Sequence, residues 1–157
     1  MPEYTRDLVE FLHGLQASHL SAEILDRARY FLLDYLSVAI RGSREESAKA
    51  VQRMIQRALP STPETQLASV LGTSLRTMTA YAALANGTAS HGIEMDDTHS
   101  GGSIHLGTTM YSGALALEEI RPEISWHQLL TAVVSGFEAT ARIAMAVQPQ
   151  EQYALGF

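Results

Sequence analysis

Titratable side chains gather on one glycine-rich stretch of the sequence, between two apolar segments. Residues 86–107 read NGTASHGIEMDDTHSGGSIHLG and hold three of the six histidines of the chain. The polar side chains of interest here are His91, Glu94, Asp96, Asp97, Thr98, His99, Ser103 and His105. Packing does not require such a cluster, and loops held by a rigid scaffold often carry function. Neighbouring carboxylates and imidazoles can push one another's pKa values apart, which acid–base catalysis uses.

Two interpretations of the loop over residues 92–107 involve no metal. In the first, Asp96, Asp97 and Thr98 cap the next turn of the chain and the histidines face water, as polar residues of ordinary loops do. In the second, the carboxylates and imidazoles form an acid–base or carboxylate-binding site. Composition alone does not favour the second interpretation over the first, so both stay open at this point.

A metal site is the third interpretation, because imidazoles and carboxylates are also metal ligands. The candidate ligands are His91, Glu94, Asp96, Asp97, His99 and His105. However, His91 and Glu94 do not form the His-Glu-x-x-His zinc motif, and Gly92 weakens a helix between them. The metal interpretation therefore has less support than the ordinary polar loop.

The composition of the chain limits the classes of protein to which it can belong. Its 157 residues fit one domain, and 46% hydrophobic against 18% charged residues allow a packed core. The net charge of -6 argues against a nucleic-acid partner, and the absence of cysteine excludes disulfides and thiolate sites. No run of ~18 uninterrupted apolar residues and no apolar leader is present. We therefore predict a cytoplasmic protein without a membrane span.

Helical periodicity dominates the chain outside the loop, so we predict an all-α helical bundle that forms a single domain over residues 1–157. The predicted helices start near Thr5, at Ser21 (ending at Gly42), at Ser43, at Thr73 or Ser74, at Thr108 and at Ser125. The expected caps include Ser43 with Glu46 and Ser125 with Gln128. Residues 66–71 are the one segment that could form a short strand. A helix end near Pro60 and a turn over 61–64 precede it.

The order of several motifs resembles the MmgE/PrpD family. The family pattern is Asn-Gly, then His, then an acidic-hydrophobic-Asp-Asp-Thr run, then a further His. Here these are Asn86-Gly87, His91, residues 94–98 and His105. The neighbouring motifs agree in order: LLDYL at 32–36 followed by Gly42, VLG at 70–72, ALALEE at 114–119 and AVVSGFE at 132–138. The resemblance covers nearly the whole chain.

The resemblance implies an enzyme that needs neither a cofactor nor a metal, is homodimeric in its complete form and acts on a small polycarboxylic acid. Family members include 2-methylcitrate dehydratase, cis-aconitate decarboxylase and iminodisuccinate epimerase. Their reactions pass through a carbanion-like centre beside a carboxylate. Such an enzyme must hold the carboxylates, place an acid or base at the reacting carbon and stabilise the developing charge.

The same resemblance assigns roles to four loop residues. Glu94, Thr98 and His105 would contact the substrate, with His105 as the partner of a carboxylate and Thr98 as a neutral donor. Asp97 and His105 would be catalytic, with Asp97 orienting His105 or the loop, because a carboxylate repels an anion. For His91, a helix-end histidine bonded to a backbone carbonyl is at least as good an interpretation as a catalytic role.

The chain departs from the family pattern in three ways. Leu106 follows His105 where proline is common, and Glu94 replaces a frequent aspartate with a side chain one methylene longer. The chain also stops at Phe157, where relatives continue with a Gly-aromatic-His run, later lysine and tyrosine site residues, an α+β lid domain and closing helices. We therefore expect an N-terminal fragment of the family's helical part.

Two alternatives from other classes remain beside a lyase or isomerase. One is a non-catalytic helical dimerisation module. The other is a metal-dependent hydrolase built on His91, Glu94 and His99.

We expect the 157-residue chain alone not to turn over cis-aconitate or 2-methylcitrate, because the resemblance places several site residues beyond Phe157. The measurement is the loss of each acid over time with the purified chain. Turnover that disappears in a His105→Ala chain would contradict this expectation, since it would show a complete site.

Overall fold

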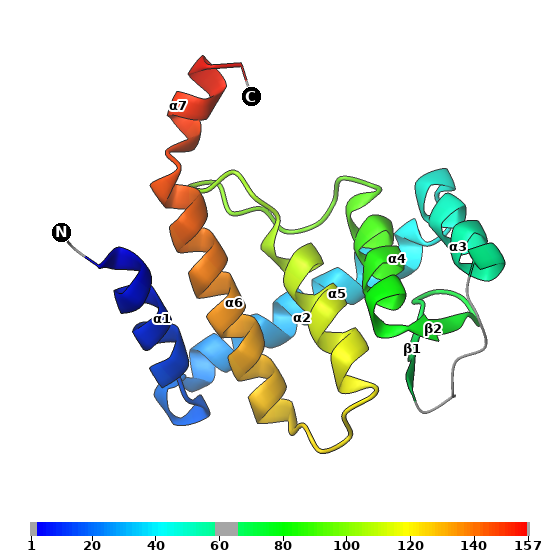
Figure 1. The fold of residues 1–157 in the computed structure, drawn as a ribbon, viewed down its shortest axis with the longest axis horizontal. Coiled ribbons are helices and arrows are strands. Elements are labelled where there is room, and N and C mark those ends of the chain that lie inside the picture. The colour runs from blue at the N-terminus through cyan, green and yellow to red at the C-terminus, as the bar shows by residue number, and fades with distance from the viewer. Residues whose placement is uncertain (1–2, 59–65, 157) are drawn as a thin grey trace.

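The computed structural model describes residues 3–58 and 66–156, which form seven α-helices and a two-stranded sheet (Figure 1). The elements are α1 (Tyr4–Gly14), the short 3-10 helix η1 (Ala17–His19), α2 (Ala22–Gly42), α3 (Glu46–Ala58), β1 (Leu67–Ser69), β2 (Arg76–Met78), α4 (Thr79–His91), α5 (Leu106–Glu118), α6 (Trp126–Ala146) and α7 (Pro149–Ala154). The predicted all-α class is confirmed. The predicted helix end near Pro60 and the turn over 61–64 lie outside the described residues.

Helix α2 is the central support of the fold, and α4, α5 and α6 all pack against it (Figure 1). Tyr35 of α2, Tyr111 of α5 and Val133 of α6 belong to one buried cluster. The hydroxyl groups of Tyr35 and Ser112 are hydrogen-bonded at 2.9 Å, and Tyr111 donates to the carbonyl of Ala28. Burial raises the pKa of Tyr35 to about 12. These buried phenols are hydrogen-bonded and tie α5 to α2.

Helix α4 approaches α2 closely because small residues line the contact. A Cβ atom on Gly42 would lie 1.9 Å from the carbonyl oxygen of Ala89. The buried residues of α4 are Ala82, Ala85, Asn86, Ala89 and Ser90. This contact fixes the last turn of α4, and with it His91, relative to α2.

The hairpin before α4 corrects one predicted boundary. The sequence predicts a helix from Thr73 or Ser74, but residues 76–78 form β2 and α4 begins at Thr79. The predicted strand within 66–71 is confirmed as β1, which pairs antiparallel with β2. Gly72 has a φ of 74°, a left-handed conformation that glycine adopts without strain, at the turn between the strands.

Asn86 of the Asn-Gly pair anchors this hairpin to α4. Its Oδ1 accepts the N–H of Leu71 at 2.8 Å, and its Nδ2 donates to the carbonyl of Ser69 at 2.9 Å. The side chain is buried, with 3% of its residue surface exposed, and both ends of the amide are hydrogen-bonded. Asn86 therefore has a structural place in the fold.

The two predicted capping boxes have different outcomes. At α6 the box is confirmed, because Ser125 and Gln128 each accept a hydrogen bond from the other's backbone N–H. The box of Ser43 with Glu46 is wrong. Ser43 is the C-cap residue of α2, and its hydroxyl donates to the carbonyl of Ile40 at 2.8 Å, so it ends one helix and does not begin the next.

Helix α6 is both long and apolar. Among the described residues it is one helix that is long and apolar enough to cross a membrane by length and composition, with a mean hydropathy of 1.3 and 22% of that window buried. The sequence analysis used a stricter criterion, ~18 uninterrupted apolar residues, and α6 does not meet it, because His127, Glu138 and Arg142 lie within the helix. A helix packed in a domain core also meets the criterion of length and composition, and α6 buries Leu129, Leu130 and Val133. Farther along it, Ile143 and Met145 are exposed.

Replacement of Gly42 by alanine is expected to lower the free energy of unfolding by about 1–3 kcal/mol or more, because the new methyl group must push α4 away from α2. Gly113→Ala is the matched control: a Cβ atom there meets nothing within 4 Å, in the middle of α5. Alanine at Gly113 should be neutral or stabilise by about 0.5–1 kcal/mol.

Urea unfolding followed by circular dichroism measures both effects. A Gly42→Ala chain as stable as the unmodified chain would show that the two helices do not touch at this point.

Candidate active site

The ends of two helices bring the two ends of the loop together. Helix α4 ends at His91, and His105 is the N-cap residue of α5. Because α4 and α5 pack against each other, the rings of His91 and His105 lie edge to face, with centroids 4.7 Å apart and planes at 63°. The loop between them turns back on itself, and the N–H of His99 donates to the carbonyl of Ile104 at 2.8 Å.

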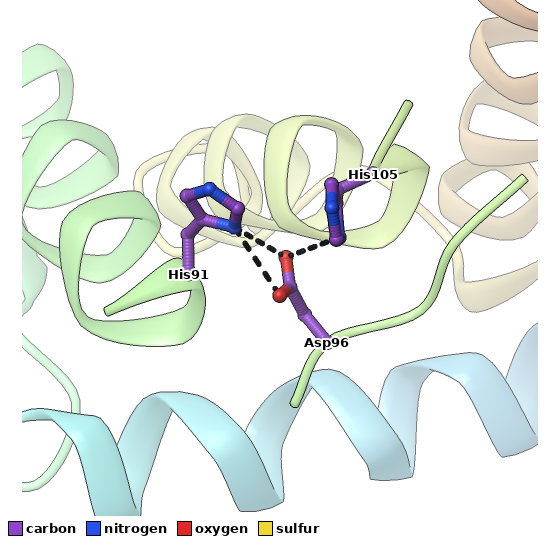
Figure 2. A group of neighbouring side chains, drawn as sticks. All are labelled: His91, Asp96 and His105. Carbon is purple, nitrogen blue, oxygen red and sulfur yellow. Dashed lines mark hydrogen bonds and ion pairs between the residues drawn. The ribbon is translucent and has the colours of Figure 1, made fainter. Parts of the chain in front are cut away.

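Asp96 lies between the two imidazoles (Figure 2). Nδ1 of His91 is 3.1 Å from its Oδ2 and 3.2 Å from its Oδ1, and Nδ1 of His105 is 3.3 Å from its Oδ2. The hydroxyl of Thr108 donates to the same Oδ2 at 2.6 Å. The Asp96 side chain is only 2% exposed, so these groups replace water as its hydrogen-bond partners.

A second layer of hydroxyl groups supports this carboxylate. Ser90, fully buried on α4, lies with its hydroxyl 3.0 Å from that of Thr108 and 3.1 Å from the carbonyl of Gly87. Thr108 of α5 therefore connects α4 to Asp96. Neither hydroxyl has a sequence signal of function, because each falls within the regular pattern of a packed helix.

Asp97 has a different task from Asp96. Its Oδ1 accepts the N–H of Gly107 at 2.8 Å and so caps the first turn of α5 from outside the helix. A Cβ atom on Gly107 would lie 2.4 Å from this oxygen, which shows how close the approach is. Partial burial raises the pKa of the Asp97 carboxyl above its ordinary value, as do Asp96 and Asp34, while the Gly107 N–H and His105 lower it.

Asp97 was expected to orient His105 or the loop. In the structure these two contacts are made by two adjacent residues. Asp97 closes the loop onto α5, whereas Asp96 contacts His105. The sequence analysis considered Asp96 as a cap or metal ligand and did not count it among the catalytic or substrate-binding residues. His91, expected to bond a backbone carbonyl in the non-functional interpretation, lies instead against the Asp96 carboxylate.

Glu94 and Thr98 lie at the edge of this cluster. The Oγ1 of Thr98 is 3.5 Å from Nδ1 of His105, and Oε1 of Glu94 is 3.6 Å from Nε2 of His91. Glu94 has a left-handed φ of 52°, and its side chain is 76% exposed. Positive φ is uncommon for a residue other than glycine, so the backbone at Glu94 departs from regular helix or strand geometry.

Two hollows adjoin the cluster, and the predicted residues divide between them. The first, of about 750 Å³, runs between α4 and α5 and includes His91, Glu94, His105 and Thr108 in its lining. The second, of about 540 Å³, is lined by Asp97, Thr98 and His99 together with Arg27, Tyr30 and Asp34 of α2. Arg27 is a cation beside the loop that sequence reasoning missed, because it is far away in the chain.

The residues that could hold a metal ion are His91, Asp96 and His105, with one ligand atom of each within 4.8 Å of the others. This trio differs from the predicted hydrolase set, since neither Glu94 nor His99 belongs to it. The Nδ1 of His99 accepts the N–H of Gly102 at 2.9 Å. In the trio, Oδ2 of Asp96 already has hydrogen bonds with His91 and Thr108 and lies 3.3 Å from Nδ1 of His105, so a metal is not needed to explain the cluster.

The fold and this cluster define a helical domain that carries a histidine–carboxylate site where two helix ends meet. Residues 6–156 match the MmgE/PrpD N-terminal domain. The chain therefore belongs to the MmgE/PrpD family.

Several relatives in this family are named for one activity. The chain is 29% identical to a cis-aconitate decarboxylase-like protein of Aspergillus oryzae, over 91% of this chain and 30% of the relative. It is 26% identical to a cis-aconitate decarboxylase of Aspergillus terreus, over 91% of this chain and 29% of that protein. The mouse cis-aconitate decarboxylase is 31% identical over 88% of this chain and 28% of its own length. The chain thus spans less than a third of these relatives.

Two substitutions of Asp97 are expected to separate its hydrogen bond from its charge. Asp97→Ala loses the cap on α5 and should cost about 1 kcal/mol of stability. Asp97→Asn keeps an oxygen for the Gly107 N–H and removes a charge that burial disfavours, so at neutral pH it should be at least as stable as the unmodified chain.

The pH dependence follows from the raised pKa of Asp97. The folded chain binds this proton more readily than the unfolded chain, so the cost of the charge is present above the folded pKa and fades as pH falls through it. The advantage of Asp97→Asn should therefore shrink toward acid pH. Urea unfolding across this range measures it, and an advantage that grows toward acid pH would contradict the assignment.

Proposed function

We propose that this chain is the N-terminal segment of a cofactor-independent lyase or isomerase that acts on a small polycarboxylic acid. The observation that carries the proposal is the buried Asp96 carboxylate bound between two imidazoles at the edge of a hollow, in a member of the MmgE/PrpD family. Relatives named as cis-aconitate decarboxylases support the choice of substrate class. Dehydration, decarboxylation and epimerisation beside a carboxylate all remain within the proposal.

The proposed chemistry uses His105 as the residue that exchanges a proton at the carbon beside the substrate carboxylate. Asp96 holds the His105 ring, as a carboxylate orients the imidazole in other acid–base sites. Thr98, 3.5 Å from the same ring, supplies a neutral hydrogen-bond donor, and Glu94 lies at the mouth of the first hollow. Asp97 supports the site indirectly, because it fixes the start of the helix that carries His105.

The charge of the site also bears on the substrate class. The chain has a net charge of -6, which repels an anion at long range. Arg27 in the second hollow offers a local positive charge against that field. We propose that it contributes to the binding of one substrate carboxylate, and that further segments, which the longer relatives contain, contribute to the binding of the others.

A helical dimerisation module is the second candidate, and the exposed apolar surface of the chain favours it. Ile143, Met145 and Val147 at the end of α6 are about half exposed, at 56%, 55% and 47%. Apolar surface of this kind often marks an interface. Homodimer formation is also part of the first proposal, so the two candidates differ in ligand binding. A cytoplasmic location and the absence of nucleic-acid or membrane partners remain predictions.

Tricarballylate, a polycarboxylate that lacks a reactive hydroxyl or double bond, is expected to protect the chain against thermal unfolding. A ligand that binds the folded chain alone raises its stability by about 2.7 kcal/mol at a hundred times its dissociation constant. His105→Ala should weaken this binding by about tenfold or more, since a hydrogen bond to a charged group contributes ~1.5–3 kcal/mol.

His127→Ala, on the exposed start of α6, is the matched control and should leave protection unchanged. Protection by cis-aconitate should follow the same pattern. If neither acid protects the chain and light scattering still finds a dimer, the enzyme proposal is wrong and the dimerisation module replaces it.

A further inference from the structure

We propose that Asp96 fixes the proton of two imidazoles at once, and that His91 is therefore a second proton-exchanging residue of the site, beside His105. The class of ligand that the two rings meet is taken from the proposed function, so the inference rests on that proposal. The arrangement of the rings comes from the geometry of the described residues. No role for His91 follows from the family pattern as read in the sequence.

The first step concerns the hydrogen atoms around Asp96. An ionised carboxylate accepts hydrogen bonds and donates none. The Nδ1 atoms of both histidines face it, at 3.1 and 3.3 Å from Oδ2. Each ring makes a favourable contact with this carboxylate only when its Nδ1 carries a proton, and Nδ1 of His105 also lies 3.5 Å from the hydroxyl of Thr98. If either Nδ1 were unprotonated, its lone pair would face a carboxylate oxygen that is almost wholly removed from water.

The second step is that nearby groups leave Asp96 little freedom. The Thr108 hydroxyl donates to Oδ2 at 2.6 Å, and the Ser90 hydroxyl shares its hydrogen between the hydroxyl of Thr108 at 3.0 Å and the carbonyl of Gly87 at 3.1 Å. A hydroxyl has one hydrogen, so Thr108 gives its proton to Asp96 and accepts the proton of Ser90. The carboxylate is thus held from α4, α5 and the loop at once, and its orientation sets that of both rings.

The third step is the consequence for the other ring nitrogens. A neutral imidazole with its proton on Nδ1 has a lone pair on Nε2. In Figure 2 the rings of His91 and His105 stand on either side of Asp96, and the second nitrogen of His91 lies on the far side of its ring from the carboxylate. Both residues line the hollow of about 750 Å³. The site therefore holds two proton acceptors that reach the same space.

The two rings differ in their surroundings, which gives His91 its own task. Its Nε2 is 3.6 Å from Oε1 of Glu94, so a carboxylate oxygen already lies near the nitrogen that would meet a ligand. Glu94 is mostly exposed and free to yield this position to a substrate carboxylate. When His91 carries a second proton, both its N–H groups have a carboxylate partner. In the proposed reaction, His105 takes a proton from a substrate carbon, and the electron pair of the broken C–H bond stays beside the substrate carboxylate. His91, when it carries a second proton, is the residue that can donate one.

A metal ion would require the opposite proton arrangement. The ring nitrogens that face Asp96 are the Nδ1 atoms, and a cation bound beside this carboxylate would take their lone pairs. Both Nδ1 atoms would then lack a proton. The position of the proton on each ring thus separates the two accounts directly.

Nitrogen NMR of the chain with isotope-labelled histidine measures these positions, at a pH well above the ordinary imidazole pKa of ~6.5. We expect His91 and His105 to carry the proton on Nδ1. The chain provides internal references of the opposite kind, because Nδ1 accepts a backbone N–H in His99, from Gly102 at 2.9 Å, and in His19, from Gln16 at 3.3 Å. His91→Gln, at the exposed end of α4, assigns the His91 signals.

Asp96→Asn is the variant that tests the cause. Nδ1 of His91 is 3.2 and 3.1 Å from the two carboxylate oxygens, so in either orientation the donating amide nitrogen would lie against this ring, and at least one histidine should move its proton to Nε2. Asp97→Asn, one residue along, is the control and should leave both rings unchanged. The spectrum of the unmodified chain decides the proton positions even if Asp96→Asn fails to fold.

Titration with tricarballylate completes the test, and we expect it to shift the Nε2 signals of both rings, with His91→Ala weakening binding about tenfold. His127→Ala, on the exposed start of α6, should bind the acid as the unmodified chain does. If the acid moves His105 alone, the inference about His91 is overturned and the proposed function stands. If it moves neither ring, the proposed function fails. An unprotonated Nδ1 on His91, or zinc bound at one equivalent through both rings, overturns the inference whatever the acid does.

Discussion

One buried carboxylate determines the arrangement of the site. The Asp96 side chain is 2% exposed, and the removal of a carboxylate from water is costly unless donors replace the lost hydration. His91 and Thr108 are hydrogen-bonded to it, and Nδ1 of His105 lies 3.3 Å from its Oδ2. A partly formed cluster is unfavourable, because a buried carboxylate that lacks one of these neighbours is incompletely hydrogen-bonded. The end of α4, the start of α5 and the loop between them must therefore form together.

The packing of the helices places the two histidines close enough for both to contact the Asp96 carboxylate. His91 and His105 come from the facing ends of α4 and α5, and their separation depends on how closely those helices pack on each other and on α2. Gly42 allows α4 to touch α2, and Tyr111 ties α5 to the carbonyl of Ala28 on α2. Asn86 holds the hairpin to the middle of α4. Contacts outside the cluster thus set the distance between two imidazoles.

Sequence reasoning reached those parts of the structure that local patterns determine. Helical periodicity and the caps at Ser21 and Ser125 predicted helices that the structure contains. It failed where a distant contact decides. Ser43 ends α2 because its hydroxyl bonds Ile40, and residues 76–78 join a strand because β1 lies beside them.

The same limit explains the predictions for the site. The loop could be located because titratable residues stand out between apolar helices. The sequence could not show which aspartate contacts the histidines, because Asp96 and Asp97 are adjacent and chemically identical. Only the fold turns one toward the rings and the other toward the N–H of Gly107. Arg27 shares a hollow with Thr98 although the two are far apart in the sequence, and no spacing rule predicts that contact.

The negative charge of the chain bears on why imidazoles, and not fixed cations, lie beside Asp96. A site for a polycarboxylate needs positive charge, yet the chain is acidic, and Asp96 adds a negative charge at the centre of the cluster. A fixed cation in that position would neutralise Asp96 permanently and could neither take nor give a proton at neutral pH. Imidazoles can do both, because each ring can change its charge as a ligand arrives. A buried carboxylate between two imidazoles therefore fits the proposed chemistry, because imidazoles can exchange protons where a fixed cation cannot.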